Sequence, residues 1–446
     1  MIVTFEEILD RISILNRDIQ ELNRFKNRIP GNRLYYANLN ESFEGKLRQL
    51  KQEKEALLGI TIKNPPTWLV GMINSFALEN HSENKTYIEE ENGKGTLSKI
   101  DKPMSGSHNI KQFLREIPKT EIHLHLEACL SKDSLKKLLK KNNILISEEE
   151  FESKFIFKDL NGFIQLFFFI QSSVKSESDF SILIESLGLY MKKDNIVYAE
   201  VYLAPTKFLQ IGLNFEKMLQ IVIEEIRKIK KQDNREIKVI IDVSRTFGVD
   251  NAMNNLNRVL KLEYPEVIGI GLGGAELLGP AKDYEKVFTI AREAGLRVVA
   301  HAGEDDGPWS IWDAIKYLKA DRIGHGTSAI QDPELIKYVT DKKIPFEVCI
   351  TSNVFTGKYV RAEENHPVRF FYDNGVVITL NTDDPEIFDV TLSDEYIKLY
   401  EKLNFSIDEI IDIVKSGVYS TFHPNKDELW NSINSGISKI KQHYNL

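Results

Sequence analysis

Cysteine and long apolar runs are scarce in this sequence, and positive charge is outnumbered by negative charge. Only two cysteines occur among 446 residues, Cys129 and Cys349, and neither lies in a CxxC or Cys/His metal spacing. This indicates no disulfide framework and a reducing cytoplasm. No apolar run reaches the roughly 20 residues that span a membrane, and the N-terminus lacks the pattern of a secretory signal. The net charge of −8 disfavours nucleic acid and anionic lipid. We therefore expect a cytoplasmic protein with neither as a partner.

The N-terminal part of the chain differs in pattern from the rest. Apolar residues at three- and four-residue steps, as in Ile8, Ile12 and Leu15, predict a helical hairpin over residues 1–79. Residues 80–108 lose this periodicity and gather Asn, Ser, Gly, Lys and Glu, which is typical of a linker. The hairpin either packs on the rest of the protein or joins two copies into a homo-oligomer, and so few heptads do not decide between these.

In residues 109–446, short apolar, β-branched runs alternate with amphipathic helical stretches, the pattern of parallel βα units. Polar residues gather near the C-terminal ends of these runs, which is the face where barrel enzymes build their sites. We therefore predict an α/β protein, a (β/α)₈ TIM barrel with an N-terminal helical extension. The eight runs are TEIHLHLE (120–127), VYAEVYLAP (from 197), KVIIDVSR (from 238), VIGIGLGG (from 267), RVVAHAGE (from 297), RIGHG (from 322), FEVCITSN (from 346) and VVITLNTDD (from 376).

A metal site is predicted by polar residues on three of these runs. His123 and His125 lie two residues apart on the first predicted strand, so both imidazoles project to the same side. A lone buried histidine is more often a core residue than a ligand, and the pair alone does not establish a site. His301 in HAGE and Asp383 in LNTDD complete a set of three histidines and one aspartate, which suits zinc and leaves room for water. We predict one Zn²⁺ per chain.

Three more polar residues near strand ends are candidates for the chemistry. An amino group leaves an aromatic ring only after the attacked carbon loses its aromaticity, and a proton delivered to the adjacent ring nitrogen permits this. Glu304 is the candidate donor, since desolvation would raise its pKa; otherwise it is a surface carboxylate. His325 either orients or deprotonates the attacking water, or forms a supporting hydrogen bond. Asp384 is a candidate substrate acceptor, unless Asp383 and Asp384 form a plain acidic turn.

Six motifs occur in the order EIHLHLE, GIGLGGAE, HAGEDDGPWSIWDAI, RIGHG, SNVFTG and LNTDDPEIF. Over residues 111–422 the chain thereby resembles the adenosine deaminase family of metal-dependent barrel hydrolases. The zinc ligands that this resemblance implies are His123, His125, His301 and Asp383. The catalytic residues that it implies are Glu304, His325 and Asp384. The substrate-contacting residues that it implies are His125, Glu127, Gly274 and Asp384.

The resemblance implies hydrolysis of adenosine to inosine and ammonia. Adenosine deaminases usually carry Asp and then Gly after the HxHL run, where Glu127 and Ala128 stand here. This form is more similar to adenine and aminodeoxyfutalosine deaminases, so adenine, aminodeoxyfutalosine and N6-methyl-AMP are alternative substrates. A binuclear amidohydrolase would need a bridging lysine or carboxylate at the end of the fourth strand, and VIGIGLGG has no lysine. A non-catalytic barrel would be expected to have lost Glu304, His325 or a metal ligand, and none is lost.

Overall fold

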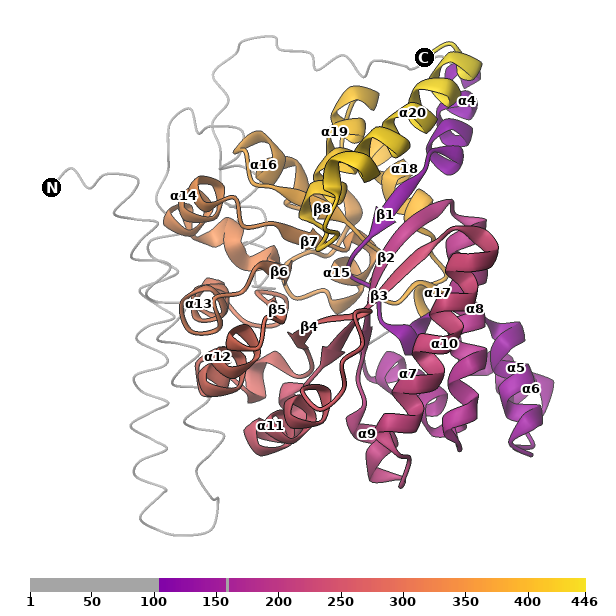
Figure 1. The fold of residues 1–446 in the computed structure, drawn as a ribbon. Coiled ribbons are helices and arrows are strands. Elements are labelled where there is room, and N and C mark those ends of the chain that lie inside the picture. Colours follow the sequence, from indigo (N-terminus) through magenta and orange to yellow (C-terminus); the bar gives the residue numbers. More distant parts are fainter. Residues whose placement is uncertain (1–103, 158–159) are drawn as a thin grey trace, which may run out of the picture.

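The computed structural model describes residues 104–157 and 160–446, and its centre is a sheet of eight parallel strands in chain order, surrounded by helices (Figure 1). The predicted (β/α)₈ barrel is thereby confirmed. The predicted hairpin of residues 1–79, and residues 80–103 of the predicted linker, lie outside the described residues. The strands are β1 (Lys119–Glu121), β2 (Ile196–Leu203), β3 (Glu236–Asp242), β4 (Val267–Leu272), β5 (Arg297–Ala302), β6 (Arg322–His325), β7 (Phe346–Val348) and β8 (Ile378–Leu380).

Hydrogen bonds just beyond β1 and β8 join the first strand to the last. The N–H of His125 donates to the carbonyl of Asp383 at 3.0 Å, and the N–H of Asp383 donates to the carbonyl of His123 at 3.2 Å. The side-chain oxygen of Asn381 also accepts the N–H groups of Ile122 and His123, at 3.0 and 3.1 Å. Three predicted metal ligands therefore lie on the seam that closes the barrel.

The connecting helices are set by ordinary capping chemistry and by apolar faces turned toward the sheet. In α10, for example, Asn214 accepts the N–H of Lys217, and the left-handed residue Asn234 ends the helix. Within the described residues, no helix is long and apolar enough to cross a membrane. The helices are α4 (Met104–Glu116), α5 (Lys132–Lys141), α6 (Glu148–Ser153), α7 (Leu160–Ser173), α8 (Phe180–Lys193), α9 (Thr206–Gln210), α10 (Phe215–Asp233), α11 (Gly248–Val259), α12 (Glu285–Glu293), α13 (Pro308–Asp313), α14 (Pro333–Lys342), α15 (Ile350–Thr356), α16 (Val368–Asp373), α17 (Pro385–Phe388), α18 (Leu392–Lys402), α19 (Ile407–Ser420) and α20 (Lys426–Tyr444).

Short helical turns fill several connections between these elements. The π-helical turn η6 (Ala314–Leu318) directly continues α13. The 3₁₀ turns are η1 (Leu126–Cys129), η2 (Glu177–Asp179), η3 (Arg245–Phe247), η4 (Glu276–Leu278), η5 (Ala281–Tyr284), η7 (Thr327–Gln331) and η8 (Glu363–Asn365). The turns η1, η3, η4 and η7 follow strand ends, so they form part of the face that carries the predicted site.

Helix α4 begins at Met104, inside the stretch 80–108 that its composition marks as a linker. It packs against α18 and α20, beside which it lies in Figure 1. The buried ammonium of Lys119 donates to the carbonyls of Leu114 and Ile117 at 3.0 and 2.8 Å, groups that a helix end leaves without partners. Composition gives no signal for this upstream extension, because Ser and Gly are poor helix formers and packing stabilises the helix.

Two predicted strands are longer than the observed ones. The first was expected over residues 120–127, but β1 ends at Glu121, and beyond it Leu124 and His125 form only isolated bridges. The seventh was expected to continue from Phe346 through TSN, but β7 ends at Val348 and α15 begins at Ile350. These lengths were wrong because apolar residues record burial, whereas a strand also requires ladder pairing to its neighbours.

Candidate active site

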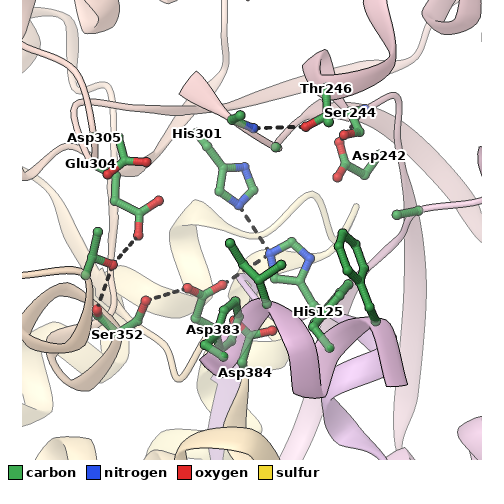
Figure 2. A pocket seen from close by; sticks show the side chains of 18 of the residues that line it. His125, Asp242, Ser244, Thr246, His301, Glu304, Asp305, Ser352, Asp383 and Asp384 are labelled. Carbon is green, nitrogen blue, oxygen red and sulfur yellow. Dashed lines mark hydrogen bonds and ion pairs between the residues drawn. The ribbon is translucent and has the colours of Figure 1, made fainter. Parts of the chain in front are cut away.

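Four predicted ligands converge on one point at the C-terminal end of the barrel. Figure 2 shows three of them, His125, His301 and Asp383. His123, His125, His301 and Asp383, here called the ligand cluster, each offer one donor atom, and these atoms all lie within 4.8 Å of one another. The Nε2 of His125 is 3.2 Å from the Nε2 of His301 and 3.2 Å from the Oδ1 of Asp383. The Nε2 of His123 is 3.3 Å from that same oxygen. The spacing allows a single cation to contact all four.

Hydrogen bonds behind the ligand cluster fit it for a metal. The Nδ1–H of His123 donates to Glu347 at 2.7 Å, so its Nε2 turns a lone pair toward the cluster. That Nε2 and the Oδ1 of Asp383 form no hydrogen bond with the described residues, although both are buried. A Cβ at Gly324 would lie 2.7 Å from the His123 ring, so glycine there makes room for the imidazole. Three imidazoles and one carboxylate are a donor set that suits Zn²⁺.

The charges around the ligand cluster favour a cation. Burial alone would lower the pKa of His123, but the neighbouring carboxylates of Asp383 and Glu347 outweigh it and raise that pKa to about 9. The pKa of His125 likewise rises to about 10, because the nearby carboxylates outweigh burial. Two buried imidazoles that hold protons this tightly mark a place where positive charge is stabilised.

Two site residues adopt backbone conformations that side chains rarely take. His325 has φ 63° and Asp383 has φ 69°, both in the left-handed region. Adjacent strand residues would point to opposite faces, but the left-handed turn at Asp383 lets both Asp383 and Asp384 line the same cavity. The Oδ2 of Asp383 accepts the hydroxyl of Ser352 at 2.7 Å (Figure 2). The predicted division between a metal ligand and a second carboxylate is therefore geometrically possible.

Glu304 is positioned by a carboxylate that the sequence analysis missed. Glu276 accepts the backbone N–H groups of all four residues Gly303–Asp306, at distances of 2.6 to 3.1 Å. The Glu304 side chain accepts the hydroxyl of Thr356 at 2.8 Å, and its other oxygen is 3.3 Å from the Nε2 of His325. Burial and two neighbouring carboxylates raise the pKa of Glu304 well above its ordinary value. Burial therefore favours the protonated form of Glu304, which suits a proton donor.

The protonated nitrogen of His325 is determined by a chain of buried hydrogen bonds. The N–H of Val368 donates to the Nδ1 of His366 at 3.1 Å, so the Nε2–H of His366 donates to the oxygen of Asn353, also at 3.1 Å. The amide nitrogen of Asn353, which can only donate, lies 3.0 Å from the Nδ1 of His325. Burial lowers the pKa of His325 to about 3. His325 is therefore neutral and presents Nε2–H toward Glu304.

The adenosine deaminase family model matches residues 118–439. This chain belongs to the adenosine deaminase family. It is 32% identical over 343 residues to an adenosine deaminase from Clostridium kluyveri, covering 75% of this chain and 98% of that protein. It is 30% identical over 320 residues to an aminodeoxyfutalosine deaminase from Streptomyces avermitilis, covering 70% and 89%. A crystal structure of an adenine deaminase from Arthrobacter aurescens has a TM-score of 0.69 and 27% identity over 72% of this chain and 99% of that one.

The family resemblance carried by the six motifs is confirmed, and this member is a hydrolytic deaminase acting on C–N bonds.

Next to its ligand cluster lies a second buried group that the sequence analysis did not find, here called the arginine cluster: Arg322, Glu200 and Glu347. Arg322 contacts Glu200 at 2.7 Å and Glu347 at 2.5 Å. Because Glu347 also accepts from His123, it joins the two clusters. Strand-end polarity alone could not reveal these pairings, which depend on the packed barrel.

The predicted substrate residues occupy different places around a cavity of about 420 Å³. His125, Gly274 and Asp384 line it, whereas Glu127 is fully buried on η1 and accepts from Gln171, which does line it, at 3.4 Å. The structure therefore brings three of the four substrate candidates to the wall and places Glu127 behind it. Its burial also raises the pKa of Glu127 to about 7.

Proposed function

We propose that this deaminase hydrolyses the exocyclic amino group of an adenine nucleoside, with adenosine to inosine plus ammonia as the reaction and one Zn²⁺ per chain. The carrying observation is that residues of the ligand cluster and Glu304, whose pKa is raised by burial, line one cavity. The relatives named above are called adenosine, adenine and aminodeoxyfutalosine deaminases, and their names share the adenine ring. Adenine and aminodeoxyfutalosine are the alternative substrates.

Glu304 is the proton donor in this proposal. A Zn²⁺ held by His123, His125, His301 and Asp383 would supply a water whose pKa is lowered toward about 7. Glu304 donates its proton to the ring nitrogen beside the attacked carbon, and this permits the attacked carbon to lose its aromaticity. The oxygen of water replaces the amino group. Of the two water protons, one restores Glu304 and the other completes ammonia.

His325 orients the attacking water rather than deprotonating it. Its Nδ1 accepts from Asn353, so the nitrogen that faces Glu304 carries a proton and can only donate. A hydrogen-bond donor at this position can hold the oxygen of the nucleophile in place beside the ring. Asn353 and His366 are positioning residues, because they act through His325.

Asp384 and Gly274 are the proposed purine contacts. The buried Oδ1 of Asp384 forms no hydrogen bond with the described residues, so it is available to the substrate. Gly274 has φ 84°, and a Cβ there would lie 2.5 Å from the Oγ of Ser244. Because Gly274 has no side chain, its backbone is uncovered and a flat ring can approach it closely.

A deamination screen tests the proposal directly. Zinc-loaded protein is incubated with adenosine, deoxyadenosine, adenine, aminodeoxyfutalosine and N6-methyl-AMP. Ammonia release, or methylamine release for N6-methyl-AMP, is measured together with bound zinc. We expect ammonia from at least one of the adenine compounds and about one zinc per chain. No ammonia from any of them with fully loaded, folded protein would overturn the proposed function.

A further inference from the structure

The wall of the cavity away from the ligand cluster is aromatic. Phe163 of α7 stacks on Phe388 of α17 with ring centroids 5.3 Å apart, and Phe355 of α15 lies 5.2 Å from Phe388. All three rings line the cavity. At its edge, Phe168 is 50% exposed although it also lines the cavity. The cavity therefore runs from a polar floor, past stacked rings, to an apolar mouth that is open to water.

One lysine is placed at this mouth. Lys207 of α9 is the one lysine or arginine among the described residues that line the cavity. Its ammonium lies over two rings, 5.1 Å from the centroid of Phe168 and 5.4 Å from that of Phe247. Such contacts hold a cation in place without neutralising it. Lys207 makes no ion pair within 4.0 Å among the described residues, whereas Lys192 pairs with Asp233 at 3.2 Å.

We infer that Lys207 forms an anion-binding subsite at the cavity mouth, so that the enzyme prefers adenine nucleosides with a negatively charged group on the side away from the amino group over adenosine itself. This inference rests on the proposed function, because the ligand cluster then fixes the end of the cavity at which the amino group lies. The stacked phenylalanines cover the part of the substrate between purine and anion. A carboxylate and a phosphate share the required charge and acceptor oxygens.

Matched pairs of adenine nucleosides test the subsite. Adenosine is compared with AMP for a phosphate, and 5′-phenylthioadenosine with its 4-carboxyphenylthio analogue for a carboxylate. We expect kcat/KM to be about tenfold higher for the charged member of at least one pair, as suits a charge pair at a partly exposed site. The preferred pair identifies the anion. The preference should shrink as ionic strength rises, because salt screens the pair.

Three variants separate charge from packing. Lys207→Met keeps the stem over the two rings and should abolish the preference for the charged member, whereas Lys207→Arg should preserve most of it. Lys231→Met, on the exposed face of α10, is the matched control and should leave the preference intact. Deamination with no preference for either charged compound, or a preference that survives in Lys207→Met, would overturn the subsite but not the proposed function. Absence of any deamination would instead count against the function itself.

Discussion

The ligand cluster and the arginine cluster are both buried at the centre of the barrel, yet their charges are balanced in different ways. Arg322 is 1% exposed and is matched by two carboxylates, the carbonyl of Ser420 at 2.9 Å and the ring of Phe422 at 3.8 Å. The ligand cluster instead brings three imidazoles and one carboxylate within 4.8 Å of one another, with no lysine or arginine among them. The arginine cluster thus contains its own cation, whereas the ligand cluster gathers donor atoms around a point where a cation can bind.

The largest effect is expected when one residue of the ligand cluster is removed. His301→Ala should lose both the metal and all measurable activity, because three remaining donors leave an incomplete shell. The barrel should stay folded, since His301 is not part of the arginine cluster. Elemental analysis, turnover and circular dichroism check this, with the exposed His443→Ala as the control. Full zinc in His301→Ala would contradict the assignment of the ligand.

Removing the proton donor should preserve both clusters but not the chemistry. Glu304→Gln is nearly isosteric and cannot donate the ring proton, so kcat should fall by roughly 10² to 10⁴-fold, the usual range for general acid catalysis. Zinc content and the melting temperature should stay near those of the parent. Near-native kcat in the variant would mean that Glu304 has only a structural role.

Breaking the arginine cluster should act on stability instead. Arg322→Met leaves Glu200 and Glu347 buried without their cation, so the free energy of unfolding should drop by about 3 to 5 kcal/mol. The matched control is Arg227→Met, which breaks an exposed pair with Glu266 and should cost about 1 kcal/mol or less. Urea unfolding of both variants measures the difference. Equal losses in the two variants would show that the buried arginine cluster contributes no more to stability than an exposed ion pair.

In the hydrogen-bond chain behind His325, one substitution can replace the donor to the Nδ1 of His325 with an acceptor. In Asn353→Asp the carboxylate still accepts from His366 but cannot donate to His325, so the His325 proton should move to Nδ1. Wrong tautomers in other enzymes lower kcat by up to about 10⁴-fold, and we expect about 10²-fold here. Nitrogen NMR of the imidazoles reports the tautomer, and the exposed Asn374→Asp is the control. A retained Nε2–H together with lowered kcat would refute this cause.

The smallest expected effect is a change in pH dependence. Glu304 must be protonated, and its pKa is raised, so activity should be present below that pKa and lost as pH rises through it. The hydroxyl of Thr356 stabilises the ionised form and so lowers the pKa of Glu304. Thr356→Val should therefore shift the alkaline limb of the kcat profile to higher pH. An alkaline limb that does not move, or that moves to lower pH, would show that Glu304 does not cause it.

The sequence predicted residues whose position along a strand determines their face. His123, His301 and Asp383 each lie at or just beyond a strand end, and all such ends in a parallel barrel meet at one face, so their convergence could be expected from the strand pattern. The same reasoning placed Glu304 and His325 beside them. In the structure, a carboxylate oxygen of Glu304 lies 3.3 Å from the Nε2 of His325.

Residues that act through another side chain could not be predicted in the same way. Glu276, Asn353 and His366 lie on turns and a helix after strands, and their partners are far along the chain, as with Glu276 and the loop 27 to 30 residues later. Strand position gives a face but no partner, so only packing determines these hydrogen bonds. Glu127 illustrates the converse, since an early end to β1 put it on a 3₁₀ turn behind the cavity wall.

The seam between β1 and β8 has a consequence for how the enzyme is made. Its hydrogen bonds unite Ile122, His123 and His125 with Asn381 and Asp383, and the bonded residues are separated by up to 260 positions along the chain. During synthesis on the ribosome, the two early histidines emerge long before the aspartate that completes their donor set. An unfinished chain thus carries imidazoles without the closing carboxylate. If this set holds Zn²⁺ as proposed above, the complete donor set would exist only after the last strand has been made.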